Sequence, residues 1–235
     1  MAAAKKETTT IQIRPLRIER IKIRIVGDTP FITHAWSEKA KKMMLDTQTG
    51  NKPKTKKRPL KRPFDEFAQG LYWLTPKPEK EVVDANTGEK IMVIEEEEFY
   101  KAIEEGARFG FPANSFKKSA IAAAYRMGWI PNQTAMKAAF FLNAEDNGEL
   151  VEIKGSTPVI REDMVKVGMG TADIRYRPEF PSWYCDMILE YNVSGDFSLE
   201  DILTCIRAGG YGIGIGEWRP DRNGSFGRYH IETVG

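Results

Sequence analysis

The segment from Gly209 to Arg228 constrains the fold more than any other part of the chain. Seven of its 20 residues are glycine, and they follow a predicted helix and precede a predicted strand. Glycine permits positive φ angles and close approach of backbones. The order is the reverse of a dinucleotide-binding fingerprint, and no Gly-Lys-Ser/Thr ending marks a Walker loop. The segment is therefore either a phosphate-binding loop or a glycine-rich connection between a helix and a strand.

Arginines within this segment favour the phosphate-binding alternative. Guanidinium groups and clustered backbone N–H groups both bind phosphate oxygens. The candidate site residues in the segment are Tyr211, Gly212, Gly214, Trp218, Arg219, Arg222 and Arg228.

The charge of the chain is balanced overall but not locally. The chain has 35 basic and 33 acidic side chains, which give a net charge of +2. Seven basic residues and no acidic residue lie between Asn51 and Pro63, and three prolines there prevent a helix or a central strand. We expect a flexible basic loop, within an insertion at about 46–98. This loop either meets a polyanion or is a solvated loop that aids solubility.

Composition excludes several classes of protein. Apolar residues make up 41% of the 235, too many for a mostly disordered chain. Two cysteines and two scattered histidines give no disulfide framework and no metal-ligand spacing, so we expect no metal and no cofactor. Residues 1–10 are polar and predicted to be disordered. No apolar run approaches the roughly 18 residues of a membrane span, and no signal core is present, so we expect a cytoplasmic protein without a membrane partner.

Strand and helix patterns occur in mixed order, which indicates an α+β fold. Alternating apolar residues predict strands at 10–25, 138–142, 150–153, 183–191 and 228–234. Caps and helical spacing predict helices that start after caps at Ser37, at Asn114 or Ser115, and at Ser198, the last one ending at Ala208.

Three motifs together resemble the RAMP superfamily, the ferredoxin-like RNA-binding proteins of CRISPR effector complexes. They are the helix, glycine-rich loop and final strand at the end of the chain, the proline-containing helix start at 111–117, and the Thr-Pro turn at 27–34. The chain is also similar to uncharacterised phage proteins with a Thr-Pro…His-Ala-Trp segment and a Gly-Glu-Trp-Arg-Pro segment. The resemblance implies a single domain at 11–235 with a ferredoxin-like (RRM-like) core.

The resemblance also implies how the chain binds. Backbone subunits of that family stack along a single strand and grip it through the glycine-rich region and the helix start. A hairpin thumb wedges into the strand, and residues 155–180, with Met164 and Met169, occupy the matching place. Single-strand binding needs a cationic track and exposed aromatic faces, each stacked base being worth roughly 1–3 kcal/mol. The remaining candidate binding residues are Trp36, Lys39, Lys41, Lys42, Phe116, Lys117, Lys118, Arg126, Arg175 and Arg177. For each aromatic residue the alternative is core packing.

Catalysis has one candidate residue. Some RAMP proteins cleave RNA with a histidine or an aspartate, and His34 follows the Thr-Pro turn, with Asp28 nearby. A histidine can act as a general acid or base, or it can simply pack or contact phosphate. Because the sequence contains no nucleophile elbow and no paired-carboxylate signature, we expect no enzymatic activity.

The predicted function is sequence-tolerant binding of single-stranded RNA or DNA by a phage-encoded protein. Copies of the chain are expected to oligomerise along the strand, in the host cytoplasm during infection. The alternatives are a phage structural or assembly protein that makes protein contacts only, and a RAMP-type endoribonuclease. The sequence leaves the choice between RNA and DNA open.

Overall fold

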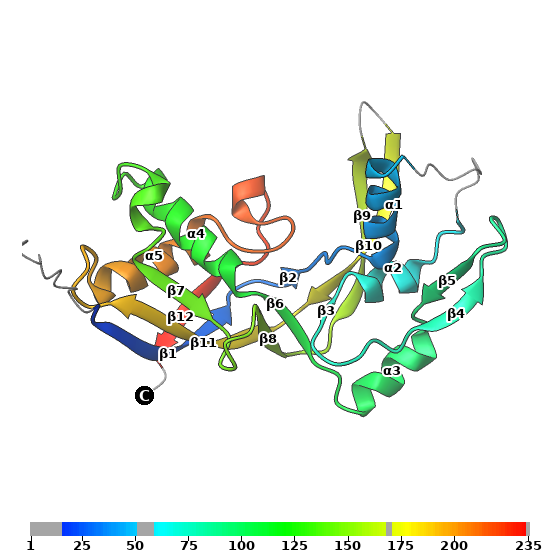
Figure 1. Cartoon of the computed structure of the whole chain (residues 1–235), viewed down its shortest axis with the longest axis horizontal. Coiled ribbons are helices and arrows are strands. Elements are labelled where there is room, and N and C mark those ends of the chain that lie inside the picture. Colours follow the sequence, from blue (N-terminus) through cyan, green and yellow to red (C-terminus); the bar gives the residue numbers. More distant parts are fainter. Residues whose placement is uncertain (1–15, 51–58, 168–170, 234–235) are drawn as a thin grey trace, which may run out of the picture.

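The computed structural model describes residues 16–50, 59–167 and 171–233, apart from a few side chains. The predictions for residues 1–10, for most of the basic loop and for Met169 lie outside the described residues, and so does the side chain of Lys39. Within the described residues the chain is α+β, as the sequence predicts (Figure 1).

Four antiparallel strands and two helices form one end of the molecule, which we call the body (Figure 1). β1 (Ile18–Gly27) lies between β12 (Tyr229–Thr233) and β11 (Trp183–Asn192). β7 (Phe140–Asn143) pairs with the other side of β11. α4 (Ala113–Arg126) precedes β7, α5 (Leu199–Gly212) joins β11 to β12, and both helices lie on the same side of the sheet.

The sheet continues beyond the body. The N-terminal end of β11 pairs with β8 (Leu150–Gly155), which pairs in turn with β6 (Phe109–Pro112). β3 (Tyr72–Trp73) completes this seven-stranded sheet.

A long hairpin extends from the sheet, and we call it the arm. It consists of β9 (Val159–Val167) and β10 (Thr171–Phe180), and β2 (Phe31–Ile32) pairs with the base of β10. The hairpin predicted at 155–180 is therefore present. The remaining elements are α1 (Glu38–Gln48), α2 (Pro63–Gln69), β4 (Lys80–Val83), β5 (Lys90–Val93), α3 (Glu96–Glu104), and the 3₁₀ helices η1 (Gln133–Met136) and η2 (Pro220–Arg222).

An apolar core fills the space between the two helices and the sheet of the body and continues to β6, β8, α2 and α3. The alternation in β11 places Cys185, Met187 and Leu189 in this core, as predicted for a strand with one buried face. The buried side chains that α4 and α5 add to it include Phe116, Ala120, Ile202 and Ile206.

Two of the three predicted helix caps, those at Ser37 and Ser198, are confirmed. The Ser37 hydroxyl accepts a hydrogen bond from the Ala40 N–H at 3.2 Å, and Ser198 forms a capping box with Asp201. The predicted cap of α4 by Asn114 or Ser115 is wrong, because the helix begins at Ala113 without a side-chain cap and both residues lie inside it.

The predicted end of α5 at Ala208 is also wrong. The helix continues through Gly212, so the first three glycines of the glycine-rich segment are helical. A Cβ atom on Gly209 would lie 2.8 Å from the backbone nitrogen of Ala120 in α4, and one on Gly210 would lie 2.0 Å from the carbonyl oxygen of Tyr229. These two glycines therefore allow α5 to pack closely on α4 and β12.

Candidate functional site

A pocket of about 320 Å³, which we call the central pocket, lies between α4 and the glycine-rich segment. Its walls come from parts of the chain that are far apart in sequence. They comprise His34, Tyr72 and Phe111, then Ser115, Lys118, Ser119 and Ala122 of α4, and Ile213 to Glu217, Arg219 and Asp221 of the glycine-rich segment. The structure thus brings the predicted helix start, the predicted loop and His34 to one place.

Two glycines with positive φ shape the wall of this pocket. Gly214 has φ of 69° and Gly216 has φ of 72°, values that side-chain-bearing residues rarely adopt. A Cβ atom on Gly216 would lie 2.3 Å from the carbonyl oxygen of Ile32. The Glu217 N–H donates to that same oxygen at 3.0 Å, so the segment is held against β2.

The central pocket contains charges of both signs. His34 Nδ1 lies 3.8 Å from Oε1 of Glu217. This contact with His34, together with the charges of Arg177 and Arg219, lowers the pKa of Glu217 although burial opposes it. Glu217 is therefore a carboxylate at neutral pH, and cations surround it.

Most predicted cations of the pocket region have acidic or backbone partners. Arg219 donates to the carbonyl oxygen of Gly216 at 2.9 Å and to Asp221 at 3.4 Å. Arg126 also forms an ion pair with Asp221, and the exposed Arg222 lies 3.9 Å from it. Lys118 differs, because its side chain is exposed and makes no ion pair or hydrogen bond within the described part of the chain.

Lys117, the neighbour of Lys118, points elsewhere. Its Nζ donates to the carbonyl oxygen of Lys137 at 2.6 Å and lies 4.0 Å from the centre of the Phe141 ring. Burial lowers the pKa of Lys117. Lys117 therefore stabilises the junction of α4 with β7 and does not face the central pocket.

The two predicted arginines of the arm are also paired. Arg175 lies 2.9 Å from Asp173. Only 11% of the Arg177 side chain is exposed, and it lies 3.3 Å from Asp163 and 4.0 Å from Glu217. Arg177 thus compensates the buried carboxylate of Asp163 and lies near the partly exposed one of Glu217, so it is not a free surface cation.

The predicted aromatic residues fall into two groups. Phe116 is fully buried against Phe111, Trp183 and Tyr229, so the prediction that its ring can stack on a base is wrong. Trp36 and Tyr211 are 60% and 69% exposed, and the Arg228 guanidinium lies 4.9 Å from the centre of the Tyr211 ring.

Trp218 belongs to neither group, because its indole N–H donates to Asp163 of β9 at 3.1 Å. The predicted Lys41 and Lys42 of α1 are exposed.

The sequence analysis missed the acidic partners Asp163, Glu217 and Asp221. Only their nearness to arginines in the sequence could have indicated them.

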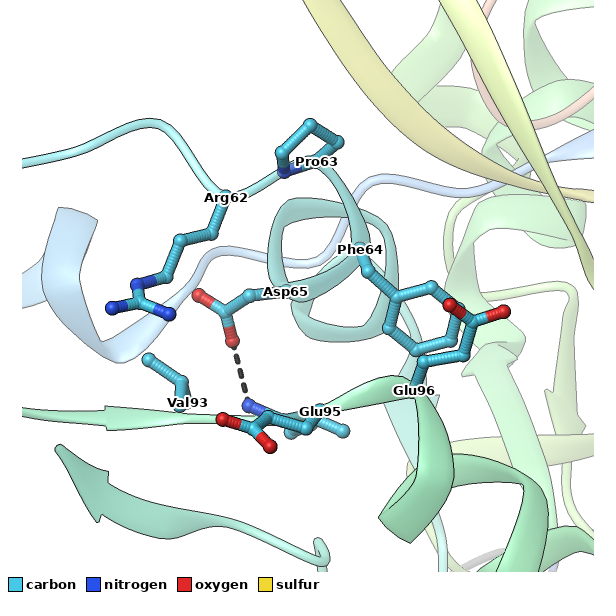
Figure 2. A pocket seen from close by; sticks show the side chains of 8 residues that line it. Arg62, Pro63, Phe64, Asp65, Val93, Glu95 and Glu96 are labelled. Atoms are coloured by element: carbon cyan, nitrogen blue, oxygen red, sulfur yellow. Dashed lines mark hydrogen bonds between the residues drawn. The ribbon is translucent and has the colours of Figure 1, made fainter.

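A second pocket, the outer pocket, has a volume of about 330 Å³ and lies where α2 begins and β5 runs into α3 (Figure 2). Asp65 in this pocket accepts a hydrogen bond from the Ile94 N–H at 2.9 Å. Three carboxylates, from Asp65, Glu95 and Glu96, line the pocket with one guanidinium, from Arg62. This surplus of negative charge disfavours a phosphate, so the central pocket remains the candidate site.

Neither protein-family models nor curated proteins give a match to this chain. In the described ranges, no helix has both the length and the apolar character needed to cross a membrane. The same ranges contain no group of three or more histidine, cysteine or acidic side chains suited to hold a metal ion.

Proposed function

We propose that this chain binds single-stranded nucleic acid with little sequence preference and oligomerises along the strand. The observation that carries the proposal is the central pocket. There the α4 start and the glycine-rich segment, the two regions that grip nucleotides in the RAMP proteins that the sequence resembles, lie against each other. In this proposal the chain is a binding protein without catalytic activity, and its likeness to phage proteins assigns it to the cytoplasm of an infected host.

The strand order of the body supports a ferredoxin-like core for this function. Counting only β1, α4, β7, β11, α5 and β12, the chain order is βαββαβ. The spatial order β12-β1-β11-β7 corresponds to fourth, first, third and second strand, with all neighbours antiparallel. A split βαβ fold has this strand order, and this likeness supports the proposed ferredoxin-like core. The arm is inserted between the second and third of these strands.

Binding would combine charge and stacking. Lys118 supplies an exposed cation at the rim of the central pocket, and Gly214 and Gly216, which have no side chain, allow a strand to approach the backbone of the pocket wall closely. Trp36, two residues from His34, and Tyr211, at the end of α5, expose rings on which bases can stack. Few of these groups read a base edge, which accounts for low sequence preference.

Electrophoretic mobility of labelled single-stranded RNA, single-stranded DNA and duplex DNA tests the proposal at two salt concentrations. Ladders on single strands that weaken as salt rises are expected, because phosphate contacts release counterions. Lys118→Ala should reduce the slope of the logarithm of the binding constant against the logarithm of salt concentration by about one, the value of a single phosphate contact. Lys101→Ala is the matched control, an exposed lysine on α3 away from the pocket. No shift with any strand at low salt, or equal losses in both variants, would overturn the proposal.

RNA cleavage is a second candidate, favoured by the contact of His34 with Glu217 at the pocket wall. It predicts that incubation of the wild type with single-stranded RNA yields shorter products and that His34→Ala abolishes them. Intact RNA after incubation with the wild type would exclude it.

A further inference from the structure

Trp218 has an unusual backbone conformation for its size. Its φ is 51°, and the other described residues with positive φ that are not glycine are Asn147 and Asn223. Asparagine tolerates this region, whereas a bulky side chain adopts it only when the surroundings impose it. The residues on either side, Glu217 and Arg219, both line the central pocket.

Part of the constraint on Trp218 comes from its own loop. The Phe226 N–H donates to the Trp218 carbonyl oxygen at 3.1 Å, and the Gly224 N–H donates to that of Arg219 at 3.1 Å. A Cβ atom on Gly224 would lie 1.7 Å from the Trp218 carbonyl oxygen, so only glycine fits there.

The rest of the constraint comes from the arm. Asp163 of β9 is 6% exposed, and its carboxylate receives donors from three side chains. Arg161 donates at 2.8 Å and Arg177 at 3.3 Å from the arm itself, and the Trp218 indole N–H donates at 3.1 Å from the glycine-rich segment. The two guanidinium groups compensate the buried charge, which makes the carboxylate a fixed acceptor for the indole.

We propose that Asp163 is a positioning residue for the central pocket and acts through Trp218. The hydrogen bond from Trp218 to Asp163 holds the backbone of Trp218 in its strained conformation. It thereby fixes the positions of Glu217 and Arg219, which line the pocket, relative to the arm. This inference rests on the proposed function of the pocket. It adds that strand binding and the position of the arm are coupled.

The test compares variants that remove one indole N–H each. Trp218→Phe keeps an aromatic ring and removes the donor to Asp163. The matched control is Trp129→Phe, which removes an indole N–H at an exposed position just after α4. The probes are labelled oligo(dT) and oligo(U), and amide hydrogen exchange of residues 213–219 is measured without any strand. We expect Trp218→Phe to weaken binding about tenfold, the worth of one hydrogen bond to a charged group, and to speed exchange at 213–219 but not in α4 or β11.

Asp163→Ala, which removes the acceptor, supplies the second half of a double-mutant cycle. If the two residues act together, Trp218→Phe should have little further effect in the Asp163→Ala background. Additive losses, or unchanged affinity and exchange in a folded Trp218→Phe protein, would overturn the inference. If Asp163→Ala does not fold, the single variant Trp218→Phe still decides. If no form of the protein binds a strand, the proposed function fails, and the exchange rates at 213–219 still test the link between arm and pocket.

Discussion

The body and the arm are stabilised in different ways. In the body, apolar side chains of β11, α4 and α5 fill a closed core. In the arm, carboxylates are surrounded by cations, with Asp163 beside Arg161 and Arg177. Near the end of the arm, Met164 and its cross-strand partner Ile174 are exposed, Met164 by 76%. Apolar burial therefore specifies the fold of the body, whereas charge pairs order the arm. The glycine-rich segment lines the central pocket and contacts the arm through Trp218.

The largest expected effect contrasts a ring in the body with a ring outside it. Phe116→Ala should lower the free energy of unfolding by about 3–5 kcal/mol, because it empties a packed aromatic site. Trp36→Ala should change it by no more than about 0.5 kcal/mol, because the ring is exposed. Chemical denaturation measures both. Similar values for the two variants would contradict the division between body and exposed surface.

The second prediction concerns the glycines of α5. Gly209→Ala should destabilise the protein by about 1–3 kcal/mol, because the new methyl group meets the backbone of α4. Gly212→Ala is the control in the same helix, where a Cβ atom meets nothing within 4 Å. This variant should stabilise by up to about 0.5–1 kcal/mol through helix propensity. A loss of stability in Gly212→Ala would show that its role is not that of an ordinary helical residue.

The third prediction uses pH to separate the two regions. Asp186 of β11 is buried, and the hydrogen bond from Arg24 at 2.7 Å, followed by Lys154, lowers its pKa. The unfolded chain then binds the proton more readily, so the contribution of this carboxylate is complete above its ordinary pKa of 3.8 and is lost as pH falls through the folded value. Thermal melts from about pH 6 to about pH 2 should fall less steeply in Asp186→Asn than in the wild type.

Asp173 of the arm is the comparison for this experiment. Lys61 and then Arg175 lower its pKa, but the group is open to solvent. The Asp173 side chain is 35% exposed and that of Asp186 is 5% exposed, so the contribution of Asp173 should shrink more at high salt, because buried pairs are screened less. An equal salt response at both sites would show that the two regions do not differ in this way.

The smallest expected effect is at Met164. Because this side chain is exposed and lies in the arm, Met164→Ser should change the free energy of unfolding by less than about 0.5 kcal/mol. Met187→Ala, a buried methionine of β11, should cost about 2–5 kcal/mol. A large effect at Met164 in chemical denaturation would show that the arm has a covered apolar surface in solution.

Local sequence signals predicted much of the fold. The cap at Ser37 and the capping box at Ser198 depend on residues within one helical turn, and the alternation in β11 is visible in the sequence itself. The helical state of Gly209 and Gly210 was not predicted, because the reason for glycine there is close packing on Ala120 and Tyr229, which the sequence does not show. For the same reason Phe116 was misassigned, since only the packed structure shows which aromatic residues are buried.

The candidate site was predicted in part. The α4 start and the glycine-rich segment were expected to act together only through the resemblance to RAMP proteins, which stays a prediction, and the structure shows that both line one pocket. The pairing of Arg177 and Trp218 with Asp163 could not be predicted, because charge partners that are separated in sequence become visible only when the strands are placed.

The base of the arm is closed by reciprocal hydrogen bonds. Ser156 donates its N–H to the Ser182 carbonyl oxygen at 2.9 Å, and the Ser182 N–H donates to the Ser156 hydroxyl at 3.0 Å. The reach of the hairpin can therefore change without displacing the strands behind it. Two residues added to each strand would lengthen the hairpin by about 7 Å and keep every side chain on its face, whereas one residue would exchange the faces. Length, in steps of two residues added between the turn and the contact of Asp173 with Lys61, is thus a variable that evolution or design can adjust.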